Sequence, residues 1–92
     1  MEGSFGNQLK TLRGRVKHLK QSDVARRLGV SVASVNYWEN DLNKPNMRNL
    51  KNLIALLFVE GAFTSTEEIA LFTNIIKPAP VFFVMDTGKE DF

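Results

Sequence analysis

Apolar residues recur along this chain at intervals of three and four residues, in five separate stretches between Phe5 and Ile76. This spacing places them on one face of an amphipathic helix, because an α-helix turns once in 3.6 residues. The inward positions predicted in this way are Phe5, Leu9, Leu12 and Val16; Val24, Ala25 and Leu28; Val35 and Trp38; Met47, Leu50, Leu53, Ile54 and Leu57; and Ile69, Phe72, Ile75 and Ile76. The pattern predicts an all-α fold of five helices.

Residues suited to helix ends stand where these stretches begin and stop. The side chains predicted to accept hydrogen bonds from free N–H groups at the helix starts are Ser4, Ser31 and Asn46. Gly14 weakens the first stretch, so we expect that helix to end at about residue 15 to 17. Gly29 can take a positive φ at the end of the second helix. The segment TSTEE, residues 64–68, contains two overlapping capping boxes and predicts the start of the fifth helix.

The segment VFFVMDTGKEDF at residues 81–92 follows two prolines that stop the fifth helix. Its apolar part has the composition of a strand and its remainder is polar and acidic. A short extended edge strand, a packed extension and a contact for another subunit all agree with this composition. We therefore predict one domain over residues 1–77 and an extension over residues 78–92, which is either partly disordered or a dimer contact.

The composition excludes several classes of protein. A chain of 92 residues fits one small domain, and without cysteine it has neither disulfides nor a thiolate metal site. The longest apolar runs are too short to span a bilayer, and the first residues lack the basic start and apolar stretch of a signal peptide. We expect a cytoplasmic protein without membrane association.

The net charge of +2 conceals a strong division along the chain. Up to Val59 there are ten lysines and arginines against four acids, whereas from Glu60 onward there are two against six. We call residues 1–59 the basic front. Such a basic segment on a small domain suggests a polyanionic partner, although solvated surface charge is the commoner explanation. Charge alone therefore does not identify the partner.

The layout around Gly29, two short helices joined by a tight corner, is that of a helix-turn-helix. The surrounding features coincide with it: FGNQLKTLR in the first helix, Gln21 and Ala25 with Gly29 four residues further on, Val35, and WEN with Pro45 six residues beyond Glu39. In their joint spacing the residues from Phe5 to Phe58 resemble the phage-repressor/Cro-like helix-turn-helix family, also called the XRE family.

The resemblance implies that the third helix enters the major groove of double-stranded DNA. Base contacts then fall on its outward residues, Val32, Ala33, Asn36 and Tyr37. Phosphate contacts fall on Gln21, Ser31, Ser34, Asn40, Lys44 and Arg48. The family position of Arg13 implies an ion pair with Glu39, and that of Ala25 a close helix crossing. For Tyr37 the alternative is a half-buried aromatic packed beside Trp38, and for Gln21 an ordinary exposed side chain.

Several residues depart from the family pattern. The third helix has no lysine or arginine, so the commonest contact to guanine is missing. This predicts either weak readout or a preference for A·T-rich sites. Lys20 stands where the family has a capping residue, so Ser22 is expected to cap the second helix instead. Asp41 replaces a glycine, which is tolerable because aspartate visits the left-handed region more readily than most residues.

These features predict a sequence-specific DNA-binding regulator, a repressor that acts as a homodimer. The alternative is a module for protein interaction or assembly. VEGAFTSTEEIALF resembles the sequence after the helix-turn-helix of some large bacterial signalling ATPases, and an antitoxin is a related option. We expect no enzyme, cofactor or metal site, because His18 has no partner at a ligand spacing and there is no phosphate-binding glycine loop.

Overall fold

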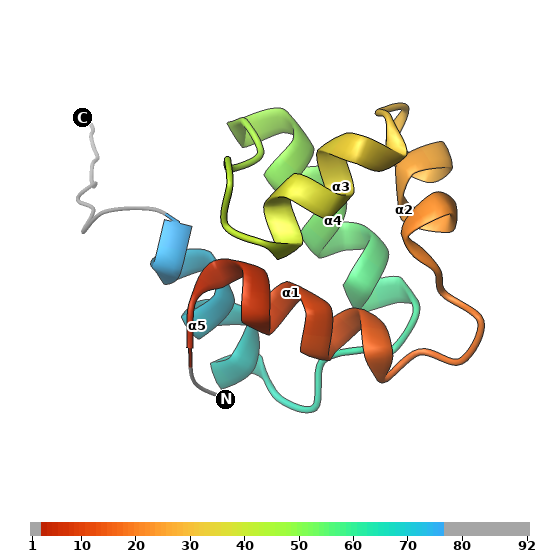
Figure 1. Cartoon of the computed structure of the whole chain (residues 1–92). Coiled ribbons are helices and arrows are strands. Elements are labelled where there is room, and N and C mark those ends of the chain that lie inside the picture. Colours follow the sequence, from red (N-terminus) through yellow and green to blue (C-terminus); the bar gives the residue numbers. More distant parts are fainter. Residues whose placement is uncertain (1–2, 77–92) are drawn as a thin grey trace, which may run out of the picture.

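The computed structural model describes residues 3–76, the last two by their backbone alone, and contains five helices in that range (Figure 1). They are α1 (Phe5–Gly14), α2 (Gln21–Leu28), α3 (Val32–Glu39), α4 (Met47–Val59) and α5 (Thr66–Ile76). The described residues form no strand, so the predicted all-α fold is confirmed. The segment VFFVM and the predicted extension lie outside the described residues.

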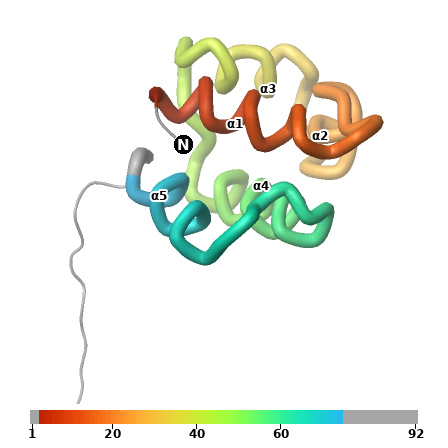
Figure 2. Tube along the Cα trace, turned by 90° about the horizontal axis from the view of Figure 1, so that it is seen from below, coloured from red at the N-terminus to blue at the C-terminus, as the bar shows by residue number. Residues whose placement is uncertain are grey.

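The core is formed by the apolar faces of all five helices. α1 packs against both α3 and α5, and α2 packs against α3 and α4. Figure 2 shows α1 and α3 on one side of the molecule and α4 and α5 on the other. The rings of Phe5 and Phe72 stack with centroids 4.8 Å apart, which fixes α5 to the first turn of α1. Trp38 is 4 % exposed and belongs to the core, as predicted.

The predicted caps are confirmed at three helix starts. The side chains of Ser4, Ser31 and Asn46 accept hydrogen bonds from the N–H groups of the third residue beyond each, at 3.2, 3.0 and 2.8 Å. Each bond satisfies a donor that has no partner within the helix. Ser65 accepts from the N–H of Glu68 in the same way before α5. The capping pattern read from the sequence therefore places four of the five helix starts.

Three local predictions are wrong. α1 ends at Gly14, slightly earlier than expected. α2 begins at Gln21 without the expected shift, because Lys20 takes the N-cap position and the carboxylate of Asp23 accepts its N–H at 2.9 Å. Met47, predicted to face inward, is 49 % exposed, because it lies on the first turn of α4 at the protein surface.

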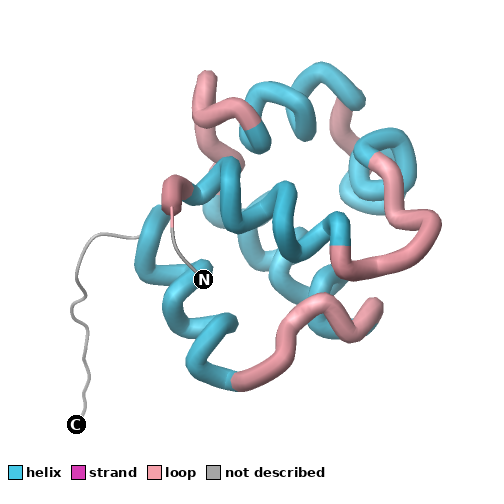
Figure 3. Tube along the Cα trace, turned by 60° about the horizontal axis from the view of Figure 1, so that its bottom comes forward, coloured by secondary structure: helices cyan, strands magenta, loops and turns pink. Residues whose placement is uncertain are grey.

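The helices are joined by short loops, as the tube in Figure 3 shows. The longest helix, α4, has 13 residues. Among residues 3–76 none of the helices combines the length and the apolar character that crossing a bilayer requires.

Candidate nucleic-acid interface

α2 and α3 are joined by a tight turn whose first residue, Gly29, has the left-handed backbone conformation. Gly29 has φ 73° and ψ 32°, and the N–H of Val30 returns to the carbonyl of Ala25 at 2.9 Å. This bond closes the end of α2, while Ser31 starts α3 two residues later. Ala25 is 2 % exposed beneath the corner, where a larger side chain would push the helices apart. The corner therefore fixes the direction in which α3 leaves α2.

Glu39 connects three helices from the last turn of α3. Its carboxylate is 1 % exposed and accepts two hydrogen bonds from Arg13 of α1, at 2.6 and 3.1 Å. It also accepts one from the amide of Gln21 at the start of α2, at 2.9 Å. Arg13 donates further to the carbonyl of Leu19, in the loop before α2. The orientation of α3 thus depends on a buried, fully bonded carboxylate.

A second link joins the start of α1 to the loop after α3. The backbone N–H of Gly6 and the hydroxyl of Ser4 both donate to the carboxylate of Asp41. These bonds lower the pKa of Asp41, the Ser4 bond most strongly, because they stabilise its charged form. Asp41 has φ 59°, in the left-handed region that aspartate visits more readily than most residues.

Gly6 lets the backbone of α1 come close to the end of α3, because it has no side chain. A Cβ at this position would lie 2.5 Å from the carbonyl oxygen of Glu39 and 2.7 Å from that of Trp38. The backbone of α1 is therefore in direct contact with the last turn of α3.

The four residues expected to contact bases lie together on the outward face of α3. All four are exposed, Val32 by 48 % and Tyr37 by 44 %. Within the described chain, the side chains of Asn36 and Tyr37 have no hydrogen-bond partner. The amide of Asn36 and the hydroxyl of Tyr37 are therefore free, within the described chain, to bind a ligand.

Some of the residues expected to contact phosphate are already engaged in the protein. The amide of Gln21 binds Glu39, Asn40 donates to the carbonyl of Asn36 at 2.9 Å, and the hydroxyls of Ser31 and Ser34 lie 3.0 Å apart. The backbone N–H groups of Gln21 and Ser22 have no acceptor among residues 3–76. At the start of α2 these two backbone donors are therefore available to an anion.

The basic residues divide into paired arginines and unpaired cations. Four arginines have carboxylate partners: Arg13 with Glu39, Arg15 with Glu68, Arg26 with Asp23, and Arg27 with Glu60. The cations without an ion pair in the described range are Lys10, Lys17, Lys20, Lys44, Arg48 and Lys51. The acids of the second half of the chain therefore neutralise part of the basic front, and the unpaired group includes both cations expected at phosphates.

The pair between Arg15 and Glu68 joins α1 to α5. Arg15 donates to both carboxylate oxygens at 2.7 and 3.0 Å, and the N–H of Thr64 donates to one of them. These bonds lower the pKa of Glu68 to about 2, because Arg15, the largest cause, and Thr64 favour the carboxylate. Glu68 remains charged at neutral pH and supports the fold away from α3.

Two exposed apolar residues between the end of α3 and the first turn of α4 were not identified from the sequence as part of the site. Leu42 is 70 % exposed in the loop after α3, and its N–H donates to the carbonyl of Tyr37 at 2.9 Å. Met47 is half exposed at the start of α4. A leucine inside the polar run Asn40 to Asn46 was the available signal.

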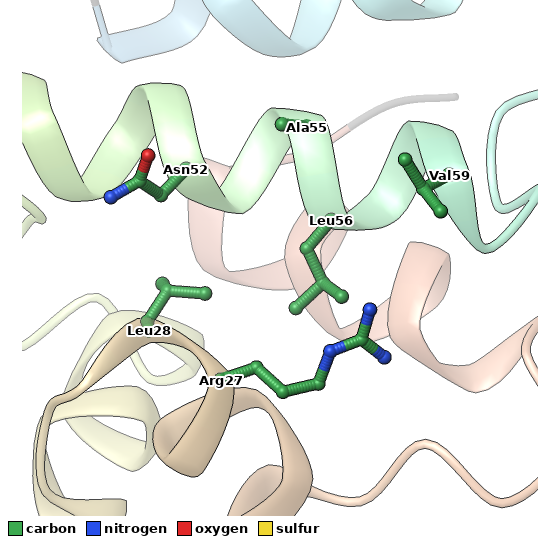
Figure 4. A pocket seen from close by; sticks show the side chains of 6 residues that line it. All are labelled: Arg27, Leu28, Asn52, Ala55, Leu56 and Val59. Carbon is green, nitrogen blue, oxygen red and sulfur yellow. The ribbon is translucent and has the colours of Figure 1, made fainter.

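A hollow of about 390 Å³ lies between α2 and α4, and Figure 4 shows the six side chains that line it. They are Arg27, Leu28, Asn52, Ala55, Leu56 and Val59. The lining is mostly aliphatic and Arg27 is paired with Glu60, so the hollow presents no acid–base or nucleophilic group. Residues 3–76 contain no cluster of three side chains able to hold a metal ion.

Comparison with known proteins agrees with this geometry. Residues 9–63 match the sequence model of a family described as helix-turn-helix. The matched range runs from the middle of α1 through α4 and contains every residue considered above for base or phosphate contact. No curated protein and no solved structure matches the chain.

Proposed function

Because the chain belongs to the XRE-type, phage-repressor/Cro-like helix-turn-helix family of DNA-binding regulators, we propose that it is a sequence-specific repressor whose α3 enters the major groove. The observation that carries this proposal is the outward face of α3. This face is exposed, its Asn36 amide is unpaired within the described residues, and its orientation is fixed by Glu39.

Base reading depends on the chemistry of that face. The amide of Asn36 matches the N6 and N7 edge of adenine, and Val32 or Ala33 can pack on a thymine methyl. Tyr37 adds a hydroxyl at the end of the same face. Since α3 carries no cation to grip guanine, the operator is expected to be rich in A·T pairs where α3 lies.

Phosphate contacts set the register of α3 without reading sequence. Lys44 and Arg48 are exposed and unpaired in the described chain, which suits them to the backbone strand beside α3. Gln21 is proposed to contribute mainly through its backbone N–H, because its side-chain amide binds Glu39. Ser31, Ser34 and Asn40 would contribute through the remaining capacity of their polar groups.

Dimeric binding is part of the proposal. One helix of eight residues makes few base contacts, and two half-sites about one helical turn apart would double them. Sedimentation at micromolar concentration, with and without an operator duplex, tests this directly. A protein that stays monomeric on a duplex with two half-sites removes the dimer from the proposal.

The proposal is tested by selecting bound duplexes from a random DNA pool at two salt concentrations. An enriched motif that persists at the higher salt supports a sequence reader. Lys44→Ala and Arg48→Ala should each weaken binding to all sequences and reduce the salt slope by about 1. Binding without a motif that vanishes with salt would reject the proposal and leave only phosphate affinity.

Protein binding is the second candidate function. The observation that favours it is the exposure of four large apolar side chains on α3 and on the segment that leads into α4, Val32, Tyr37, Leu42 and Met47. An assembly module or an antitoxin would use such a surface on a protein. Tight association with a protein, together with no DNA preference, would favour this candidate over the first.

A further inference from the structure

The surface around α3 is both apolar and basic. We name it the α3 face and define it by chain position, as the exposed side chains of α3 and of the segment that leads into α4: Val32, Ala33, Asn36, Tyr37, Leu42 and Met47, with the exposed cations Lys44 and Arg48 of the same segment as its edge. Four of the seven large apolar side chains that are well exposed in the described chain belong to it. An exposed apolar patch with a charged edge is typical of an interaction site. Base reading uses the α3 residues, but it leaves Leu42 and Met47 without a role.

One segment of this chain has the complementary composition. Residues 81–85 are Val, Phe, Phe, Val and Met, and residues 86–92 carry three acids against one lysine. The apolar part matches the exposed leucine, methionine, tyrosine and valine of the α3 face. The acidic part matches the unpaired Lys44 and Arg48 at its edge. The segment thus combines, in a short length, the two properties that the α3 face presents.

The described chain also ends at the same end of the molecule as the loop that holds Leu42. The stack of Phe72 on Phe5 brings the last turns of α5 to the start of α1, and Ser4 and Gly6 there bind Asp41, the neighbour of Leu42. Figures 1 and 2 both place the end of α5, the start of α1 and the α3–α4 loop at one end of the molecule.

Chain length permits the contact. An extended chain covers at most about 3.3–3.6 Å per residue, so residues 81–85 reach roughly 16–30 Å beyond Ile76. This reach includes the loop that holds Leu42, since only the α1 start separates that loop from α5.

We propose that residues 81–92 dock on the α3 face of their own chain and compete there with DNA. The competition rests on the proposed function, whereas the docking does not. Attachment to the same chain gives the segment an effective concentration in the millimolar range, so a weak contact suffices. A docked fraction of about nine tenths would raise the apparent Kd for DNA roughly tenfold.

The docking is tested without DNA by paramagnetic broadening of amide signals. The chain has no cysteine, so Thr87→Cys provides a single position for a spin label. We expect broadening of amides between residues 32 and 48 in the labelled chain. Adding Phe82→Ser and Phe83→Ser to it should abolish this broadening. Adding Leu71→Ser, which removes an apolar residue of α5 that is 49 % exposed, should not. Absence of broadening at the α3 face would overturn the proposal.

A mixed sample separates docking within one chain from docking between chains. Spin-labelled chains without the nitrogen isotope are mixed with isotope-labelled chains that carry no spin label. Broadening in this mixture as strong as in the single sample would overturn docking within one chain. Its absence there, with broadening in the single sample, supports the proposal.

DNA affinity then tests the competition separately. The variant with Phe82→Ser and Phe83→Ser should bind the selected duplex about tenfold more tightly than the unchanged chain. Unchanged affinity would overturn the competition. Broadening at the α3 face in a protein that binds no DNA would uphold the docking and reject only the proposed function.

Discussion

Replacing Glu39 by glutamine should destabilise the whole domain, because this one side chain of α3 binds residues of both α1 and α2. The carboxylate is 1 % exposed and accepts three hydrogen bonds, two from Arg13 and one from Gln21. Glutamine has nearly the same shape but removes the charge and turns one oxygen into an amide donor. That nitrogen would face a donor of Arg13 or Gln21, so at least one bond is replaced by a conflict.

The expected cost follows from the burial of the pair. Breaking a buried ion pair by removing one partner costs about 3–5 kcal/mol. The Arg13 side chain is 21 % exposed, so water recovers part of this loss and about 2–4 kcal/mol remains. In a domain of this size that corresponds to a fall in Tm of roughly 10–25 °C.

Urea unfolding at neutral pH, followed by far-UV circular dichroism, measures this difference. Glu67→Gln is the matched control, because Glu67 is exposed on α5 and has no ion pair in the described residues; it should change the free energy of unfolding by less than about 0.5 kcal/mol. A double-mutant cycle with Arg13→Met should give a coupling energy above about 1 kcal/mol. If Glu39→Gln is as stable as the control, the buried carboxylate of Glu39 does not stabilise the domain.

Three other substitutions test separate parts of the fold, each by the same unfolding assay. Gly29→Ala should cost about 1–2 kcal/mol, because φ is 73° there; no atom lies near the added Cβ, so the cost comes from the backbone conformation alone. Gly14→Ala at the end of α1 should be neutral or stabilising. Equal effects of the two substitutions would exclude a conformational cause. Gly6→Ala should cost about 3 kcal/mol, because its Cβ would overlap the backbone of α3, and a loss below about 1 kcal/mol would contradict that contact. Glu68→Gln should alter the pH dependence. The folded pKa of about 2 lies below the ordinary 4.5, so the carboxylate adds stability above about pH 4.5 and loses it as the pH falls toward 2. The stability difference between this variant and the unchanged chain should therefore shrink across that range, and a difference independent of pH would contradict the assignment.

Local signals in the sequence were sufficient to predict the helices. Helix periodicity, the caps at Ser4, Ser31 and Asn46, and the positive φ of Gly29 each depend on neighbouring residues. The structure confirms the five helices, the three caps and the positive φ. Asp41 also takes the left-handed conformation expected of it. Periodicity failed at Met47, because one position at a helix start can face the surface without breaking the pattern.

Contacts between distant residues could not be predicted in the same way. The binding of Ser4 and Gly6 to Asp41 joins positions 35 and 37 residues apart, and no spacing rule indicates it. The pairing of Arg15 and Arg27 with acids beyond residue 59 is equally non-local. For this reason the basic front appeared more available to a polyanion in the sequence than it is in the fold.

Asn36→Ala is the most direct test of whether α3 reads bases through its outward face. Duplexes are selected from a random pool with the unchanged chain, with Asn36→Ala, and with Asn74→Ala as a control that removes an exposed asparagine of α5. We predict that the unchanged chain and the control enrich the same A·T-rich motif and that Asn36→Ala loses the preference for adenine at one position of each half-site, at a cost of about 1–3 kcal/mol. If Asn36→Ala enriches the same motif with the same affinity, the outward face of α3 does not read bases through Asn36.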